Sequence, residues 1–317
     1  MFPPLFRREA ASTTLPPRGR PMPETPERIL HRLEWQVIRR LDGILQGDYR
    51  SLFYGAGLDL ADLREYQPGD DIRYIDWNVT ARLDAPYVRQ YHEDREITAW
   101  FLLDLSPSVD FGTVNSLKRD RLVDFVAVLA RLLTRRGNRV AAILYDSRVQ
   151  RVIPPSGGRM HVLRLINDLL RQPRLPAAPF TDLTALLATG YQVIRRRSLV
   201  FIISDFISAP GWEKPLALLN RRHETLAVRL WDPREVELPD IGIVVMQDAE
   251  TGEQLLVDTH DRRFRQRFAE AAQRRQQALT TTFRRAGVDM LSLSTEDDLV
   301  RAIVTFAGQR KQRLKHK

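Results

Sequence analysis

The most apolar stretch of the chain, residues 198–207, constrains its fold more than any other feature. Within it, Leu199–Ile203 has no polar residue, and Asp205 follows two positions later. A membrane-spanning helix needs about 20 apolar residues, so this run is too short to cross a bilayer. A short apolar run without alternation is typical of a strand covered on both faces. The sequence therefore predicts a buried central strand at residues 199–204.

Strand and helix patterns alternate on both sides of this run, as they do in chains that build a mostly parallel sheet. The expected strands are residues 99–104, 140–145, 199–204, 225–231 and 288–293. The expected helices are residues 117–136, 160–170, 183–194, 212–220, 262–286 and one that begins near 296. Residues 241–258 interrupt the alternation with two strand-like runs, which predicts a hairpin insertion. The pattern indicates a doubly wound α/β fold.

The segment before residue 97 has a different pattern. Residues 1–24 are rich in proline and lack the apolar core of a signal peptide, so we expect a flexible leader. Residues 25–96 are expected to form an N-terminal helix, at residues 26–45, and after it a small β-rich subdomain. The large α/β domain then spans residues 97–307, and residues 308–317 form a basic tail.

Composition limits the chemistry and the compartment. The 317 residues include no cysteine, which excludes disulfides, thiolate metal sites and a cysteine nucleophile and favours the cytoplasm. The net charge of +9 is local: residues 261–285 hold eight arginines against two acids, and residues 310–317 hold five cations. On the helix 262–286 we expect Arg263, Arg267 and Arg274 to face outward, as a solvated face or a surface for acidic proteins or nucleic acid.

Polar side chains gather where the expected strands end. Asp104, Ser106 and Ser108 alternate directly after the first strand, so their oxygens can converge. Asp205 follows the apolar strand, and Thr181 precedes a helix. Each alone is more often a turn or cap residue, but together they lie at the edge where doubly wound sheets bind ligands. Hard oxygen donors without His or Cys predict Mg2+, with Mn2+ or Ca2+ as alternatives.

A second polar group lies in the β-rich segment around the turn Pro68-Gly69. Its acids and bases are balanced, which favours an ion-pair network over a partner surface, and either over catalysis. The candidate residues are Arg64, Asp70, Asp71, Arg73, Asp76, Trp77 and Arg82.

These residues carry a resemblance to known families. The order Asp104-x-Ser106-x-Ser108, Thr181, Asp205 resembles the metal-ion-dependent adhesion site of von Willebrand factor A domains. The block 57–77 is similar to the bacterial domain of unknown function 58, and so are Ser204-Asp205-Phe206 and Asp232-Pro233-x-Glu235. This resemblance covers residues 33–306 and implies a von Willebrand factor A-like sheet with a small N-terminal subdomain packed on it.

The resemblance also implies a function. Asp104, Ser106, Ser108, Thr181 and Asp205 would hold Mg2+, and a MoxR-type AAA+ ATPase would be the partner. We therefore expect a non-enzymatic adaptor that helps the ATPase to mature or remodel an unidentified client protein, without an integral membrane segment. The chain has neither a glycine-rich phosphate loop nor a Gly-x-Ser-x-Gly elbow. A metal-dependent nuclease or nucleic-acid-binding protein that uses the basic helix is the alternative.

Overall fold

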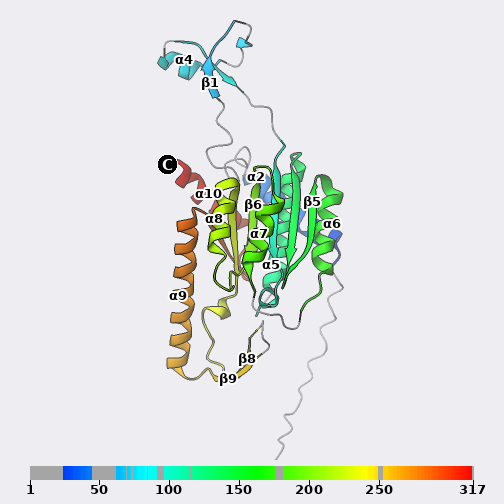
Figure 1. Ribbon diagram of the computed structural model, residues 1–317, viewed down its shortest axis with the longest axis vertical. Helices are drawn as coiled ribbons and strands as arrows, with labels where there is room; N and C mark the ends of the chain where they lie inside the picture. Colours follow the sequence, from blue (N-terminus) through cyan, green and yellow to red (C-terminus); the bar gives the residue numbers. More distant parts are fainter. Residues whose placement is uncertain are drawn as a thin grey trace, which may run out of the picture.

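A six-stranded sheet forms the centre of the protein in the computed structural model (Figure 1). The structure describes residues 24–44, 62–68, 70–72, 75–83, 85–90, 96–113, 116–175, 181–248 and 253–315. The strand order is β10-β7-β6-β3-β4-β5, and each neighbouring pair is parallel except β4 and β5. These strands are β3 Thr98–Asp104, β4 Arg139–Tyr145, β5 Val149–Ser156, β6 Leu199–Ser204, β7 Glu224–Trp231 and β10 Asp289–Ser294.

Helices cover both faces of this sheet, so the predicted doubly wound α/β fold is confirmed. One face carries α5 Lys118–Arg135, α6 Gly158–Arg171 and α10 Leu299–Lys315. The other face carries α7 Leu183–Val193, α8 Glu213–Arg222 and α9 Arg262–Ala286. Gly137, just after α5, has a φ of 81°, so it forms a left-handed cap at the end of this helix. Among the described residues, no helix is both long and apolar enough to span a membrane.

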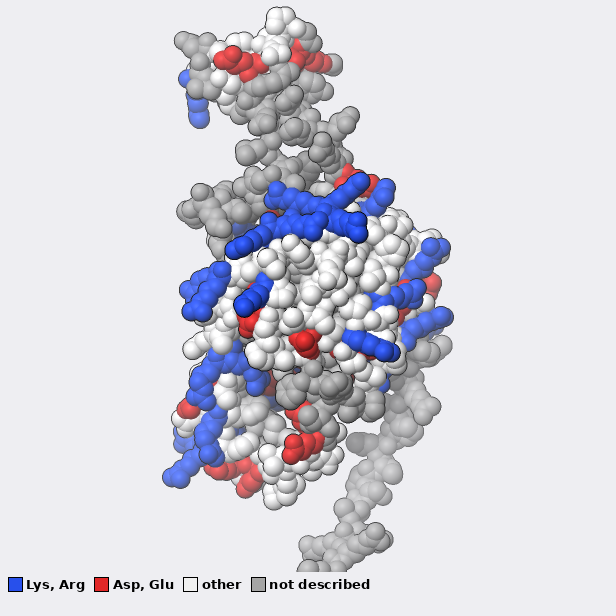
Figure 2. All heavy atoms as spheres, in the orientation of Figure 1, with Lys and Arg blue, Asp and Glu red and all other residues white. Residues whose placement is uncertain are grey.

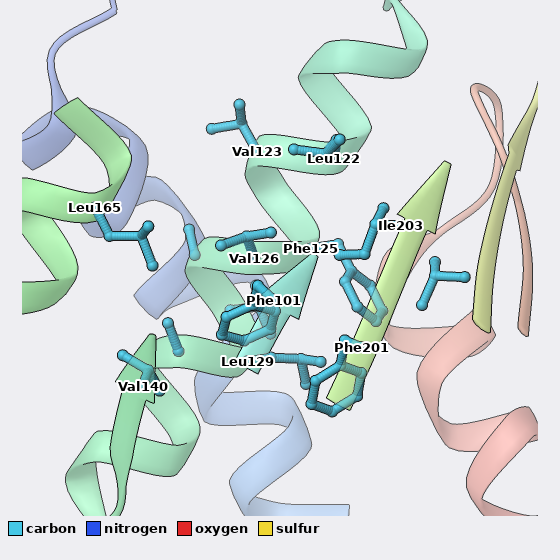
Figure 3. Close-up of a cluster of buried hydrophobic side chains, with 14 of the residues drawn as sticks. Phe101, Leu122, Val123, Phe125, Val126, Leu129, Val140, Leu165, Phe201 and Ile203 are labelled. Carbon is cyan, nitrogen blue, oxygen red and sulfur yellow. The ribbon is translucent and has the colours of Figure 1, made fainter. Parts of the chain in front are cut away.

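On the α5 side of the sheet, apolar side chains of β3, β6 and α5 pack into one core (Figure 3). Phe101 of β3 stacks on Phe201 of β6 with ring centroids 5.3 Å apart, and Phe125 of α5 meets Phe201 edge-on at 6.3 Å. All six residues of β6 are buried. A strand in the middle of a sheet covered on both faces excludes water from both sets of side chains, which is why its sequence does not alternate.

The first helical segment belongs to this core. It consists of α1 Pro26–Leu33, a π-helical turn η1 Glu34–Ile38 and α2 Arg39–Ile44. Its buried side chains pack in the cluster formed by α5, α6 and α10: Ile29, Leu30, Leu33, Val37, Ile38 and Leu41. The sequence grouped this helix with the β-rich subdomain, whereas the structure packs it against the large domain.

The β-rich segment is a small two-stranded unit. The strands β1 Asp62–Glu65 and β2 Tyr87–Gln90 pair antiparallel, and the helix α4 Trp77–Leu83 lies between them in the chain. Figure 1 draws this unit at one end of the molecule. The described contacts that define it are internal, between β1 and β2 and between α4 and β2.

Two further elements complete or correct the prediction. The predicted hairpin insertion is confirmed as β8 Ile243–Gln247 and β9 Gln254–Asp258, which pair antiparallel. The edge strand β5 was not predicted, because Pro154 and Pro155 argue against a strand and only Ile153 is buried. Residues 308–315 continue α10 rather than forming a tail. Arg310 is buried there and forms ion pairs with Glu224 and with Asp289, the latter at 3.1 Å.

Candidate functional site

The predicted metal ligands lie at the carboxyl edge of the sheet. Since β3 and β6 are parallel neighbours, Asp104 at the end of β3 and Asp205 just after β6 come to the same place. The turn Pro107–Asp110 follows β3 and brings the hydroxyl oxygens of Ser106 and Ser108 within 3.1 Å of each other. All five predicted residues are buried: Asp104, Ser106, Ser108, Thr181 and Asp205.

Asp104 is fully buried and held by two hydrogen bonds. The backbone N–H of Ser106 donates to Oδ1 at 3.0 Å, and the hydroxyl of Ser204 donates to Oδ2 at 2.6 Å. Burial and the nearby charge of Asp205 raise the pKa of Asp104 to about 6, and the bonds from Ser204 and Ser106 oppose that rise. The site thus holds two acids that repel each other when both are ionised.

Thr181 precedes α7, and its backbone contacts the loop that follows Asp205. Its carbonyl accepts hydrogen bonds from the N–H of Ala209 at 2.9 Å and from the hydroxyl of Ser208 at 3.0 Å. These bonds tie the start of α7 to the loop after Asp205. Asp182 caps α7, since its carboxylate accepts from the N–H of Thr184 at 2.9 Å.

The structure adds a buried lysine that the sequence analysis missed. Lys118, the first residue of α5, donates from Nζ to Asp205 Oδ2 at 2.8 Å and to Glu235 Oε1 at 2.5 Å. Its side chain has no exposed surface. Burial disfavours the ammonium, but Asp205 and Glu235 outweigh that effect and raise the pKa of Lys118. The only sequence feature that pointed here was the motif Asp232-Pro233-x-Glu235.

That motif positions Glu235. The carboxylate of Asp232 accepts from the Thr113 hydroxyl at 2.7 Å, from the Thr295 hydroxyl at 2.7 Å and from the N–H of Arg234 at 2.9 Å. Burial opposes ionisation of Asp232, but these hydrogen bonds hold its pKa below the ordinary value. The N–H of Asp232 in turn donates to Glu235 Oε2 at 3.0 Å. Asp232 therefore fixes three loops around the lysine.

The donor set suits a hard divalent cation. It consists of two carboxylates and hydroxyls, which match the preference of Mg2+ for oxygen. Within the described part of the chain, no three His, Cys, Asp or Glu residues cluster as metal ligands, so hydroxyls would have to complete the coordination. Asp104 and Asp205 repel each other when both are ionised, and a bound cation would relieve this repulsion. Lys118 neutralises part of the charge of Asp205.

In the polar group around Pro68-Gly69, two of the described acids accept hydrogen bonds from nearby backbone N–H groups. Asp70 accepts from the N–H of Gln67 at 2.9 Å, and Asp76 accepts from the N–H of Val79 at 3.3 Å in the first turn of α4. Asp71 is half-buried, Arg82 is exposed, and Trp77 is 69% exposed. The side chains of Arg64 and Arg73 lie outside the described residues, so the expected network is not tested there.

The basic helix α9 presents arginines to solvent, as predicted. Arg263, Arg267 and Arg274 are exposed, and Figure 2 shows basic side chains running along this side of the molecule. Leu279 and Phe283 are the buried residues of α9. Ala271 on the same helix is also exposed.

Comparison with known proteins gives a family without an assigned activity. The profile described as "Protein of unknown function DUF58" matches residues 62–278. Uncharacterized protein Rv1480 of Mycobacterium tuberculosis is 39% identical over 283 residues, 89% of this chain and 89% of that protein. Uncharacterized protein Mb1516 of Mycobacterium bovis matches with the same identity and coverage.

Solved structures of similar shape share little sequence with this chain. An aerotolerance-related membrane protein of Bacteroides fragilis has a TM-score of 0.46 at 11% identity, over 68% of this chain and 99% of that one. BatB of Bacteroides thetaiotaomicron has a TM-score of 0.42 at 11% identity, over 70% of this chain and 100% of that one.

Proposed function

Because the chain belongs to the DUF58 family, we propose that it is a non-enzymatic, Mg2+-dependent protein-binding adaptor that works with a MoxR-type AAA+ ATPase. The ATPase would act on an unidentified client protein that the adaptor holds. The observation that supports this proposal is the meeting of Asp104, Ser106 and Ser108 with Asp205 at one sheet edge. The MoxR partner is drawn from the family resemblance, and the lack of cysteine favours the cytoplasm.

The side chains at this sheet edge would have two roles, holding the metal ion and positioning its ligands. Asp104, Ser106 and Ser108 would hold the metal from the β3 loop, and Thr181 and Asp205 from the opposite side. Bound Mg2+ would supply an exchangeable coordination position for an acidic side chain of the partner. Lys118 orients Asp205, and Glu235 fixes Lys118. In this proposal the sheet edge binds an acidic side chain of the partner through the metal ion. The adaptor itself would need no catalytic residue.

A pull-down from the native host, with Mg2+ or with EDTA, tests the proposal. We expect Asp104→Asn to lose the partner as completely as EDTA does, because the carboxylate is needed to hold the metal. Asp182→Asn is the matched control: Asp182 is exposed, lies one residue from Thr181 and caps α7. Equal recovery of an AAA+ ATPase with wild type, EDTA and Asp104→Asn would contradict the proposal.

The exposed arginines of α9 support nucleic-acid binding as a second candidate, with a metal-dependent nuclease as its enzymatic form. Phosphate contacts from Arg263, Arg267 and Arg274 would retain DNA without Mg2+ and with a steep dependence on salt. Filter binding in EDTA across a salt series distinguishes the two functions. Retention that vanishes in Arg267→Glu would favour this candidate over the adaptor.

A further inference from the structure

The hairpin β8–β9 presents an apolar face to solvent. Val245 and Leu256 lie opposite each other in the antiparallel pairing, and Ile243 lies on the same face, two residues before Val245. These three side chains are 59% to 69% exposed, whereas Val257 on the other face of the hairpin is buried. Large apolar side chains grouped on one exposed face are typical of a surface that another molecule covers.

The hairpin is also acidic. Residues 240–258 hold five acids and no Lys or Arg. Asp258 lies opposite Ile243 at one end of the apolar face, and Asp248 and Glu253 follow its other end, toward the turn. These acids disfavour contact between two hairpins, or between the hairpin and anionic lipids, because like charges repel. The complementary surface is apolar and bordered by basic residues.

The opposite end of the domain carries a cluster of exposed arginines (Figure 2). They lie in the loop before β6 and at the carboxyl ends of α8 and α9: Arg195, Arg196, Arg197, Arg221, Arg222, Arg284 and Arg285. Glu224 and Asp289, the first residues of β7 and β10, form ion pairs with Arg310. Among the described residues, no carboxylate lies within ion-pair distance of the seven exposed arginines, so they leave an excess of positive charge at this end.

Apolar side chains lie beside these arginines. Tyr191 and Val193 at the end of α7 are exposed, and so is Leu218 of α8. The guanidinium of Arg222 lies over the Tyr191 ring, 5.7 Å from its centroid, so the ends of α7 and α8 form one surface. We call these apolar side chains and the seven arginines the arginine surface. It has the chemistry that the acidic, apolar hairpin requires.

Helix α9 separates the hairpin from the arginine surface. Near its amino end, Arg265 forms an ion pair of 3.0 Å with Asp240 at the base of the hairpin. At its carboxyl end, the side-chain amide of Asn220 in α8 donates to the carbonyl of Ala286 at 3.0 Å. The 25 residues of α9 span about 37 Å, so the hairpin does not meet the arginine surface of its own copy (Figure 1).

We propose that the hairpin of one copy docks on the arginine surface of a second copy. The apolar face of Ile243, Val245 and Leu256 covers Tyr191 and Leu218, and the acids of the hairpin face the arginines. The contact is head to tail, so it continues into a ring or a filament. The inference goes beyond the proposed adaptor site, because neither surface contains a predicted metal ligand.

Sedimentation of the full chain over a concentration series tests the proposal. We expect species larger than a monomer, an association that weakens as NaCl is added, and no effect of EDTA. A chain that stays monomeric at every concentration overturns the proposal. Binding of that monomer to phosphatidylserine vesicles would then assign the hairpin to a lipid surface instead.

Two double variants each remove one of the surfaces. Val245→Ser with Leu256→Ser removes the apolar side chains of the hairpin, and Arg196→Glu with Arg221→Glu reverses the charge of the arginine surface. Each should weaken self-association at least about tenfold, since apolar burial or charge complementarity is lost. All four side chains are exposed, so the melting temperatures should stay close to that of wild type.

A mixture of the two double variants tests the head-to-tail geometry. Each variant keeps one intact surface, so the equimolar mixture should form a one-to-one dimer that grows no further. Arg164→Glu with Arg171→Glu, at exposed positions of α6, makes the same change in net charge and should associate as wild type does. A mixture that stays monomeric, or a hairpin or arginine-surface variant that associates as strongly as wild type, overturns the proposal.

Discussion

At the scale of single residues, the candidate site depends on a buried ammonium between two acids. Lys118 lies between Asp205 and Glu235 with no exposed surface. A buried ion pair adds little net stability compared with an apolar replacement of the whole group, but removing one partner leaves an uncompensated charge. The arrangement therefore positions Asp205 more than it stabilises the fold.

Lys118→Met should lower the free energy of unfolding by about 3 kcal/mol, because Asp205 and Glu235 then share no cation. Added Mg2+ should restore part of this loss if it binds beside Asp205. Urea denaturation with and without Mg2+ measures both effects. Lys214→Met, at an exposed lysine of α8, should change stability by less than about 0.5 kcal/mol. A Lys118→Met loss as small as that of the control would contradict the buried pair.

His223 gives a second prediction at this scale. Burial and the charge of Arg222 lower the pKa of His223 to about 4 from 6.5. Between pH 6.5 and pH 4, His223 is protonated in the unfolded chain but not in the folded chain. The free energy of unfolding therefore decreases as the pH falls from 6.5 to 4. Asp104 opposes this trend, since its raised pKa lets the folded state take a proton in part of the same range.

The His223 contribution is isolated by comparing wild type with His223→Leu. The difference in free energy of unfolding between the two should shift by about 2 to 3 kcal/mol in favour of the variant from pH 7 to pH 4. Denaturation at several pH values measures it. Parallel pH profiles for the two proteins would show that His223 titrates normally.

At the scale of elements, the buried side chains of α9 all lie in its carboxyl-terminal half. It has 25 residues, yet its buried side chains are Leu279 and Phe283. Phe283 packs edge-on against Phe206 at 4.9 Å and lies 5.7 Å from Trp212. The amino-terminal half of α9 runs past the sheet toward the hairpin β8–β9 (Figure 1).

Phe283→Ala should therefore cost about 3 to 5 kcal/mol, as expected for a large cavity in a packed aromatic cluster. Phe268→Ala, at a half-buried position of the same helix, should cost about 1 kcal/mol. Chemical denaturation compares the two. Equal losses would mean that the whole length of α9 is held to the domain.

At the scale of the whole molecule, the first helices complete the main core although the β-rich segment separates them from it in sequence. Ile38 is fully buried in the cluster that includes α5 and α10, while Trp35, three residues earlier, is 59% exposed. The large domain thus begins near residue 26, and the unit formed by β1, α4 and β2 is inserted within it.

Ile38→Ala should lower the free energy of unfolding of the main sheet by about 2 to 4 kcal/mol. Trp35→Ala should change it by less than about 1 kcal/mol. Hydrogen exchange of the β3 amides reports the loss in the sheet itself. Unchanged protection of β3 in Ile38→Ala would show that residues 26–44 are separable from the sheet.

The sequence by itself determined the central strands and the helices around them, though not the edge strand β5, and it determined the edge at which polar groups gather. Leu199–Ile203 predicted a central strand, and the positions of Asp104 and Asp205 after strands predicted their meeting, since parallel strands end at a common edge. The helix 262–286 was predicted with its observed bounds because its periodicity and cap are local.

The tertiary structure alone decided what depends on contacts between distant residues. Lys118 lies 87 residues from Asp205 and 117 from Glu235 in sequence, and nothing local distinguishes it from a solvated first-turn lysine. Arg310 looked like part of a charged tail until its partners Glu224 and Asp289 were brought beside it. The local sequence pattern predicts which segments are buried and where strands end. The pairing of buried charges depends on how distant segments pack, and the local pattern does not predict it.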